Sequence, residues 1–201
     1  MIAPHAAPVR VATPADIDAV VATLTTAFFD DPVWGPAFPD AGRREAQASA
    51  LWRLLATSAL RYPWLLVTGN AESAAVWIPP GGVELTPAEH GGLEEFLIGV
   101  AGRSVAVGIL RLFEQLEAVY PGEPHFYLSL LATHDDHRGR GLGMGLLTQS
   151  LARIDRLGAA AYLESSNPAN NKRYESVGFT ARDEITLGSG HVVTTMWRPA
   201  R

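Results

Sequence analysis

A glycine-rich stretch two-thirds along the chain has the residue types needed to bind an anionic ligand. It runs from His137 to Gly145 and reads HRGRGLGMG. An apolar segment precedes it and an amphipathic segment follows, so it is expected to join a buried strand to a helix. Glycines let a ligand approach the backbone, and the free N–H groups at a helix start attract anions. The turn therefore suits a pyrophosphate, to which Arg138 and Arg140 can add charge-assisted hydrogen bonds.

The spacing of this stretch differs from two common nucleotide-binding loops. A Walker loop needs a Gly-Lys-Ser/Thr ending, which is missing, and the dinucleotide fingerprint stands near the front of a chain with an acidic residue behind it. A tight connection without any ligand stays open. His134 to His137 has donor types found at metal sites, but short polar residues also serve turn geometry, so no metal site is predicted.

Composition narrows the class of partner. The chain has 201 residues, 47% of them hydrophobic, and 16 basic against 21 acidic side chains give a net charge of -5. This balance provides no basic field for nucleic acid or an anionic membrane. No cysteine is present, which excludes disulfides and thiolate chemistry. The first eight residues do not read as a signal peptide and no apolar run is long enough for a membrane span, so we expect a cytoplasmic protein.

Hydrophobic periodicity predicts alternating strands and helices without a linker, hence one domain over residues 1–201. Thr13 and Thr86 each precede a proline and a carboxylate in the pattern of a capped helix start. Residues 31–40 are predicted to form a loop, and His125–Thr133 a strand buried on both sides. The predicted strands are Val9–Ala12, Trp64–Thr68, Ala74–Ile78, His125–Thr133, Ala161–Ser165, Thr180–Leu187 and Val192–Trp197. The predicted helices follow Thr13, span 48–59, extend from Thr86 to about Val119 with breaks near Gly99 and Gly102, and cover 141–157 and 170–177.

Two motifs together resemble a known enzyme family. Arg138, Gly141 and Gly143 satisfy the order R-x-x-G-x-G, and Asn167 is followed seven residues later by Tyr174 in the run YESVGF. These motifs resemble the coenzyme A motif and the N…Y-E-x-x-G-F motif of the GNAT superfamily of N-acetyltransferases. The resemblance covers about residues 126–197, and the layout of the whole chain is similar to puromycin N-acetyltransferase and related enzymes in that family.

The resemblance implies an α/β fold with a mixed sheet of about seven strands, flanked by helices and splayed between the fourth and fifth strands. Acetyl-CoA would lie in that gap as co-substrate. The backbone of Leu131, Ala132 and Thr133 would pair with its pantetheine arm, and Asn170 matches a position that often bonds it. The pyrophosphate would be held by the turn residues Arg138, Gly139, Arg140, Gly141, Leu142, Gly143 and Met144.

The same resemblance assigns the proton transfers. Tyr174 matches the tyrosine that protonates the departing thiolate, a role that suits an ordinary pKa of about 10. Glu164 is the candidate base that removes a proton from the acceptor amine. Three alternatives stay open. They are a packing role for Tyr174, an ion pair of Glu164 with Arg153 or Arg173, and a structural or basic role for His125.

The acceptor site is expected to combine aromatic and acidic side chains, namely Phe28, Asp30, Asp31, Trp34 and Trp77. The predicted reaction is direct attack of a small-molecule primary amine, antibiotic-like or aminonucleoside-like, in a ternary complex formed by a monomer or homodimer. The insertion from Pro79 to Pro124 would cap the acceptor site. The alternatives are a protein lysine or N-terminal acetyltransferase and a non-catalytic acetyl-CoA sensor. A triad hydrolase is disfavoured because no G-x-S-x-G elbow is present.

Overall fold

The computed structural model describes residues 8–201, so residues 1–7, where no signal peptide is expected, lie outside the described part. Seven strands form one mixed sheet among these residues. The strands are β1 (Val9–Val11), β2 (Leu65–Thr68), β3 (Ser73–Ile78), β4 (His125–Thr133), β5 (Ala160–Ser165), β6 (Thr180–Thr186) and β7 (Val192–Arg198). Their order is β1-β2-β3-β4-β5-β7-β6, in which only the β4–β5 pair is parallel. This confirms the predicted fold class.

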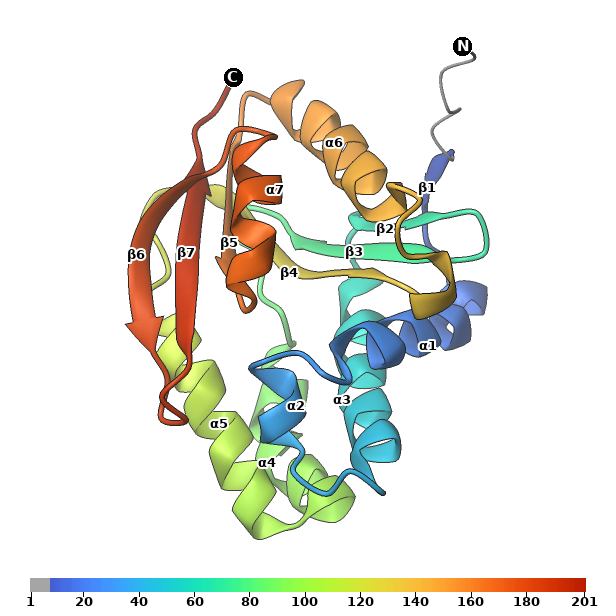
Figure 1. Cartoon of the computed structure of the whole chain (residues 1–201), viewed down its shortest axis with the longest axis vertical. Helices are drawn as coiled ribbons and strands as arrows, with labels where there is room; N and C mark the ends of the chain where they lie inside the picture. The colour runs from blue at the N-terminus through green and yellow to red at the C-terminus, as the bar shows by residue number, and fades with distance from the viewer. Residues whose placement is uncertain (1–7) are drawn as a thin grey trace.

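Seven α-helices surround the sheet within the described range (Figure 1). Short 3-10 turns at Pro14–Asp16, Asp135–His137 and Pro168–Asn170 lead into loops or helices. The helices are α1 (Ile17–Phe28), α2 (Trp34–Ala37), α3 (Arg44–Ala59), α4 (Pro87–Ala101), α5 (Arg103–Glu117), α6 (Leu142–Asp155) and α7 (Asn171–Glu175).

The sheet opens in its middle, as the resemblance implies. β4 and β5 are paired only from His125 and Ala160 to Leu128 and Leu163, and beyond this point the two strands diverge. On the other side of β4, Val76 pairs with Leu130 but Trp77 pairs with Leu128, which leaves Ser129 in a β-bulge. In Figure 1, β3 and β4 run across the view while β5, β7 and β6 run nearly vertically. The gap between β4 and β5 is therefore a feature of the backbone itself.

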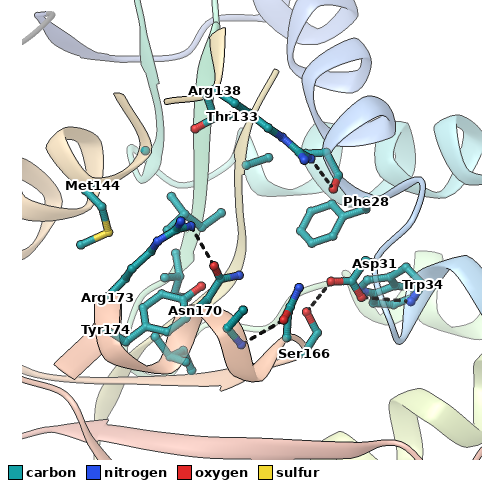
Figure 2. Close-up of a pocket in the computed structure, with 18 of the residues that line it drawn as sticks. Phe28, Asp31, Trp34, Thr133, Arg138, Met144, Ser166, Asn170, Arg173 and Tyr174 are labelled. Carbon is teal, nitrogen blue, oxygen red and sulfur yellow. Dashed lines mark hydrogen bonds between the residues drawn. The ribbon is translucent and has the colours of Figure 1, made fainter. Parts of the chain in front are cut away.

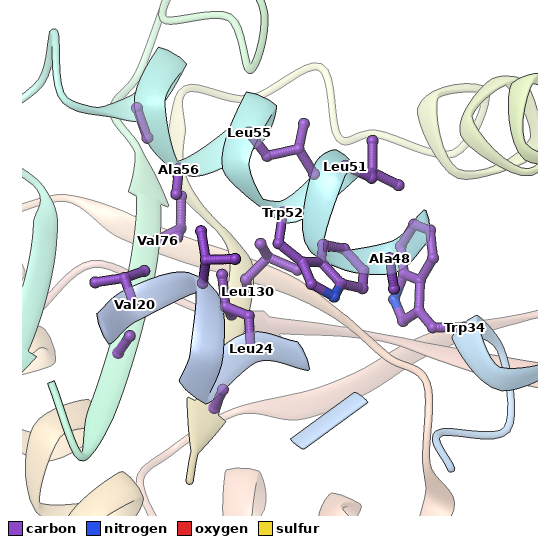
Figure 3. Packing of buried hydrophobic residues seen from close by; sticks show 14 of the residues in the cluster. Val20, Leu24, Trp34, Ala48, Leu51, Trp52, Leu55, Ala56, Val76 and Leu130 are labelled. Carbon is purple, nitrogen blue, oxygen red and sulfur yellow. The ribbon is translucent and has the colours of Figure 1, made fainter. Parts of the chain in front are cut away.

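Two apolar clusters cover the two faces of the sheet. One joins α1 and α3, with the α4–α5 pair, to one face, and Val20, Leu24, Leu51, Trp52 and Leu130 meet in it (Figure 3). The other packs α6 against β3, β4 and β5 through side chains such as Leu147, Leu151 and Ile154. The spacing of three and four residues seen in the sequence thus places one face of each helix in a core.

Helix starts are set by local hydrogen bonds that the sequence predicts. At α4 the Thr86 N–H donates to Glu89 Oε2 at 2.7 Å, and the Glu89 N–H donates back to Thr86 Oγ1 at 3.3 Å. At the other cap the Thr13 N–H and hydroxyl both donate to Asp16 Oδ2 at 2.8 Å, and the Asp16 N–H donates to the Thr13 carbonyl at 2.9 Å. These contacts satisfy N–H groups that the helix itself leaves unpaired. The break at Gly102, where φ is +86°, separates α4 from α5 as predicted, whereas the break predicted near Gly99 is wrong because α4 runs through that residue.

Two further predictions about the elements are wrong. Residues 31–40 are not wholly a loop, because α2 forms within them, and Asp31 caps it by accepting hydrogen bonds from the Val33 and Trp34 N–H groups. β4 is not buried on both sides, because every second residue, beginning at His125, stays partly exposed. Buried and partly exposed residues alternate along β4 although most of them are apolar. Beyond Leu128, one side of the strand faces the gap.

Candidate active site

A cavity of about 740 Å³ occupies the gap between β4 and β5. Its walls come from the ends of both strands, the turn before α6, the first residues of α6, the α7 region and the segment after α1. Figure 2 shows Arg173, Tyr174 and Asn170 on one wall and Phe28, Asp31 and Trp34 on another. Leu131, Ala132 and Thr133 line the same cavity from β4. The segments named by the sequence motifs are therefore brought to one place.

The glycine-rich turn has the backbone form that an anion site needs. Gly139 and Gly141 have φ values of +77° and +75°, and Gly141 is the N-cap of α6. A Cβ atom added to either glycine would meet no other atom within 4 Å, so both face open space. The first N–H groups of α6 have no acceptor within the helix and point toward the turn. This geometry fits a pyrophosphate group.

Gly143 is needed for a different reason. A Cβ atom at this position would lie 2.7 Å from Thr133 Oγ1, closer than real Cβ atoms come to their neighbours. Thr133 is itself fixed by a 2.8 Å hydrogen bond between its hydroxyl and that of Ser73. The glycine therefore lets the first turn of α6 lie directly against the end of β4, which keeps the cavity narrow.

The two arginines of the turn have different surroundings. Arg138 lines the cavity, while its Nη2 atom pairs with Asp135 Oδ1 at 2.9 Å and donates to the Ala27 carbonyl at 3.2 Å. Arg140 is exposed, contacts His137 Nδ1 at 3.1 Å and does not line the cavity. The Arg140 side chain is thus not part of the cavity lining, and the role of both arginines at the cofactor site stays a prediction.

Tyr174 combines a cavity position with a buried hydroxyl. It lies on α7, lines the cavity and packs its ring 6.2 Å from that of Phe179. Burial raises the pKa of Tyr174 to about 12, with a further contribution from the negative charge of Asp31. The hydroxyl therefore keeps its proton at neutral pH, and its pKa lies above the ordinary value of about 10 that was expected for the acid, which makes Tyr174 a weaker donor than an exposed tyrosine.

Glu164 lies on β5 and carries a buried carboxyl group. It lines the cavity, and burial raises its pKa to about 8 although the Tyr127 and Tyr162 hydroxyls lower it. Within residues 8–201 its Oε1 atom has no hydrogen-bond partner. A buried carboxylate with this proton affinity is a competent base near neutral pH.

Neither Arg153 nor Arg173 forms an ion pair with Glu164. The guanidinium of Arg153 lies over the Trp64 ring at 4.1 Å from its centroid. Arg173 donates to Asn170 Oδ1 at 3.0 Å. Glu164 thus has no cationic partner among the ion pairs of the described residues.

The segment after α1 supplies the aromatic and acidic wall. Phe28, Asp30, Asp31 and Trp34 all line the cavity. Besides capping α2, Asp31 accepts a 2.7 Å hydrogen bond at Oδ2 from the Ser166 hydroxyl, which ties the segment to the end of β5. The Asp30 side chain is 91% exposed and lies 3.9 Å from Arg44. The two carboxylates therefore differ, since Asp31 organises the wall and Asp30 stands at its rim.

Trp77 is the one predicted acceptor residue that lies elsewhere. It is fully buried and packs in the α6 cluster, away from the cavity. On β3 its side chain points to the face covered by α6, because side chains alternate along a strand. The prediction that Trp77 contacts the acceptor is wrong.

The remaining candidates have structural surroundings. The His125 ring contacts the Glu123 carbonyl at 2.7 Å through Nδ1, stacks edge-on to Tyr162 and does not line the cavity. At the turn, His134 Nδ1 accepts from the Asp136 N–H. Across residues 8–201 no three His, Asp or Glu side chains come together as metal ligands.

Several cavity-facing or adjacent residues were missed by sequence reasoning. Tyr127, Ser129 and Arg173 line the cavity, and Leu116 of α5 is the contribution of the predicted capping insertion. Glu84 lies behind Ser129 and accepts a hydrogen bond from its hydroxyl. Alternation along β4 places Tyr127 on a definite face, but the bulge at Ser129 and the approach of Glu84 leave no signal in the sequence.

Comparison with known proteins shows the family. Residues 70–179 match the sequence profile described as acetyltransferase (GNAT) family. The match covers more than half of the chain and includes the β4 strand, the glycine-rich turn and the Tyr174 motif. The chain belongs to the GNAT acetyltransferase family and is a transferase of that class.

Solved structures agree with this assignment. A Corynebacterium glutamicum protein described as histone acetyltransferase HPA2 and related acetyltransferase is 26% identical, with a TM-score of 0.74, over 98% of this chain and 97% of that one. Arylalkylamine N-acetyltransferase 2 of Aedes aegypti is 17% identical, with a TM-score of 0.69, over 96% and 99%. An agmatine N-acetyltransferase is 16% identical, with a TM-score of 0.58, over 96% and 98%. The last two share the fold. Among the described helices none has the length and apolarity to cross a membrane.

Proposed function

We propose that the protein transfers the acetyl group of acetyl-CoA to a primary amine of a small molecule, by direct attack in a ternary complex. The observation that carries the proposal is that Tyr174 and Glu164 line one cavity, with Tyr174 protonated at neutral pH and Glu164 at a pKa of about 8. We include in the proposal that the partner is small, that the chain acts as monomer or homodimer, and that it is cytoplasmic.

The cavity residues fit acetyl-CoA at one end. When bound, acetyl-CoA supplies an acetyl thioester as the group to be transferred. The open space before Gly139 and Gly141 and the free N–H groups of α6 would hold its pyrophosphate. The backbone of Leu131 to Thr133, which diverges from β5, would bond the pantetheine amides as an added strand. Asn170 and Met144 would flank the arm from the α7 and α6 sides.

The other end would activate the amine. An ammonium has no lone pair with which to attack, so Glu164 accepts its proton first, directly or through water. The amine nitrogen then forms a bond to the acetyl carbon as the carbon–sulfur bond breaks. Tyr174 gives its proton to the departing sulfur, and the second proton of the amine nitrogen, which is lost as the neutral amide forms, returns to the Tyr174 oxygen directly or through water. Phe28 and Trp34 would pack against the apolar part of the acceptor, which favours a cationic amine with an aromatic or aliphatic body.

A protein acceptor is the second candidate, because the Corynebacterium relative carries a histone acetyltransferase description. The walls of the cavity argue against a protein acceptor, because α2 and Leu116 of α5 line its acceptor end, whereas a peptide would need an open groove there. A non-catalytic acetyl-CoA sensor would not need the hydroxyl of Tyr174.

The test is release of coenzyme A thiol in the presence of two panels. One contains small amines such as aminonucleosides, arylalkylamines, polyamines and amino acids, and the other contains lysine peptides and peptides with free N-termini. Release with a small amine at a kcat/KM at least tenfold above that of any peptide supports the proposal. Release only with peptides, or acetyl-CoA binding without release in either panel, contradicts it.

A further inference from the structure

Glu84 brings a second buried carboxyl to the point where the sheet opens. It lies between β3 and α4, and its Oε1 atom accepts a hydrogen bond from the Ser129 hydroxyl. Ser129 is the bulged residue of β4, so it is paired with neither β3 nor β5. Glu84 thus contacts the bulged residue at which β4 parts from β5, while the pairing of β4 with β3 resumes at Leu130.

The register of the parallel pair places Glu164 opposite this contact. The last β4–β5 pair joins Leu128 to Leu163, so the next residues along the two strands are Ser129 and Glu164. Both of these residues line the cavity. Tyr127 and Tyr162, which pair across the same strands, lie one step before Leu128 and Leu163. Glu164 and the Ser129 contact of Glu84 therefore both lie where β4 and β5 part.

No cation within ion-pair distance neutralises these carboxyls in residues 8–201. Arg61, whose positive charge lowers the pKa of Glu84, donates to the Ser58 carbonyl and hydroxyl and to the Val83 carbonyl. Burial raises the pKa of Glu84, while the Ser129 hydroxyl lowers it. Burial raises the pKa of Glu164, and the negative charge of Glu84 adds to that rise. The other titratable groups that face the two carboxyls are Glu117, Tyr120, Tyr127 and Tyr162.

We propose that Glu84 and Glu164 form a coupled carboxyl pair that shares one proton at neutral pH, with Glu84 as a positioning residue for Glu164. Two like charges buried together resist full ionisation, so the pair gives up its two protons in separate steps. Glu164 accepts the proton of the acceptor ammonium while the shared proton lies on Glu84. Glu84 then releases its proton to water, and its negative charge holds the accepted proton on Glu164. This role rests on the proposed acetyl transfer.

The direct test is carboxyl NMR titration of protein labelled with 13C at the glutamate side chains, with no substrate present. Replacement of each residue in turn by glutamine assigns its resonance. In Glu84→Gln the midpoint of Glu164 is expected to fall by about one pKa unit, and in Glu164→Gln the midpoint of Glu84 is expected to fall by a similar amount. Glutamine keeps an oxygen that can accept from Ser129, which preserves the contact.

Two further variants make the result specific. Ser129→Ala removes the hydroxyl that stabilises the charged form of Glu84, so the midpoint of Glu84 should rise while that of Glu164 falls. Such opposite movements mark a shared proton, and this variant carries the test where Glu84→Gln does not fold. Glu114→Gln removes an exposed carboxylate of α5 that is not among the groups facing the two carboxyls, and should move Glu164 by no more than about 0.2 unit, because solvent screens it.

A Glu164 midpoint that is unchanged in both Glu84→Gln and Ser129→Ala overturns the pair. Because the titration uses no amine and no acetyl-CoA, this outcome would leave the proposed acetyl transfer standing. Conversely, shifted midpoints in a protein that acetylates nothing would reject the proposed function and keep the coupled pair.

Discussion

The two ends of the cavity are built from different parts of the chain. The end formed by the turn before α6 uses main-chain groups from one continuous stretch, with Gly139 and Gly141 facing open space. The acceptor end uses side chains from separate segments, among them Phe28, Glu164 and Leu116. A main-chain site is encoded locally and appears as a motif, whereas a side-chain site exists only once the fold brings its members together.

The largest expected effect is a loss of turnover on removal of the Tyr174 hydroxyl. Tyr174→Phe should lower kcat by about 10² to 10⁴ while acetyl-CoA affinity stays within about twofold, because the variant loses only the proton donor. Steady-state kinetics and calorimetry on one preparation provide both values. Tyr62→Phe, which removes a hydroxyl outside the cavity, is the matched control. Full turnover by Tyr174→Phe would assign the proton to water or to the product amine.

At the main-chain end, Gly141→Val should weaken acetyl-CoA binding by about 10²-fold. Valine is strained at a φ of +75°, and its side chain would fill the space before the turn. Gly158→Val is the control, since Gly158 also has a positive φ, of +61°, and faces open space at the other end of α6. Calorimetry that finds equal affinity in both variants would remove the turn from the binding site.

At the side-chain end, stability should depend on pH through Glu164. Its folded pKa, about 8, exceeds the ordinary value of 4.5, so the folded protein binds this proton more tightly than the unfolded chain does. The free energy of unfolding should therefore fall as pH rises from about 4.5 to about 8, by an amount on the order of several kcal/mol. Urea unfolding across this range should show the slope.

Glu164→Gln should flatten that slope, and Glu175→Gln, which changes an exposed carboxylate on α7, should leave it unchanged. Equal slopes in wild type and Glu164→Gln would mean that Glu164 titrates as a solvated group. It would then be too weak a base for the role given to it.

The smallest effect is expected at Asp30. Asp30→Asn should raise the KM of a cationic acceptor by no more than about twofold, and the difference should vanish at high salt, because this carboxylate is 91% exposed. Kinetics at two ionic strengths measure it. A tenfold, salt-independent rise would place Asp30 in direct contact with the amine.

Asp31→Asn should act on the fold of the same wall. The Asp31 carboxylate accepts from two backbone N–H groups and from Ser166, so its loss should lower the free energy of unfolding by about 1 to 2 kcal/mol. Thermal unfolding of Asp31→Asn and Asp30→Asn side by side separates the two carboxylates. Identical melting temperatures would show that the contacts of Asp31 contribute nothing to stability.

The same division explains what the sequence could predict. Strands, capped helices and the glycine turn follow from short-range periodicity, capping residues and glycine placement, and the structure has them close to the predicted bounds. The turn and Tyr174 lie in motifs, so their common location followed from the resemblance. Gly143 was expected at the ligand, but its lack of a side chain is required by Thr133.

The acceptor end was only partly predictable. Trp77 is a residue type that often lines pockets, yet the alternation of side chains along β3 directs it toward the α6 cluster. α2 is four residues long and depends on contacts of Asp31 that cross to β5. The bulge at Ser129 and the buried approach of Glu84 arise from tertiary packing, which leaves no periodic trace in the sequence.

Intact-protein mass spectrometry with acetyl-13C-labelled acetyl-CoA tests the central claim most directly. Direct attack in a ternary complex predicts that the protein mass stays unchanged with labelled acetyl-CoA alone. Once an accepted small amine is added, labelled amide and coenzyme A should appear in equal amounts. A labelled protein that passes its acetyl group to the amine, or label found on peptides and on no small amine, would contradict it.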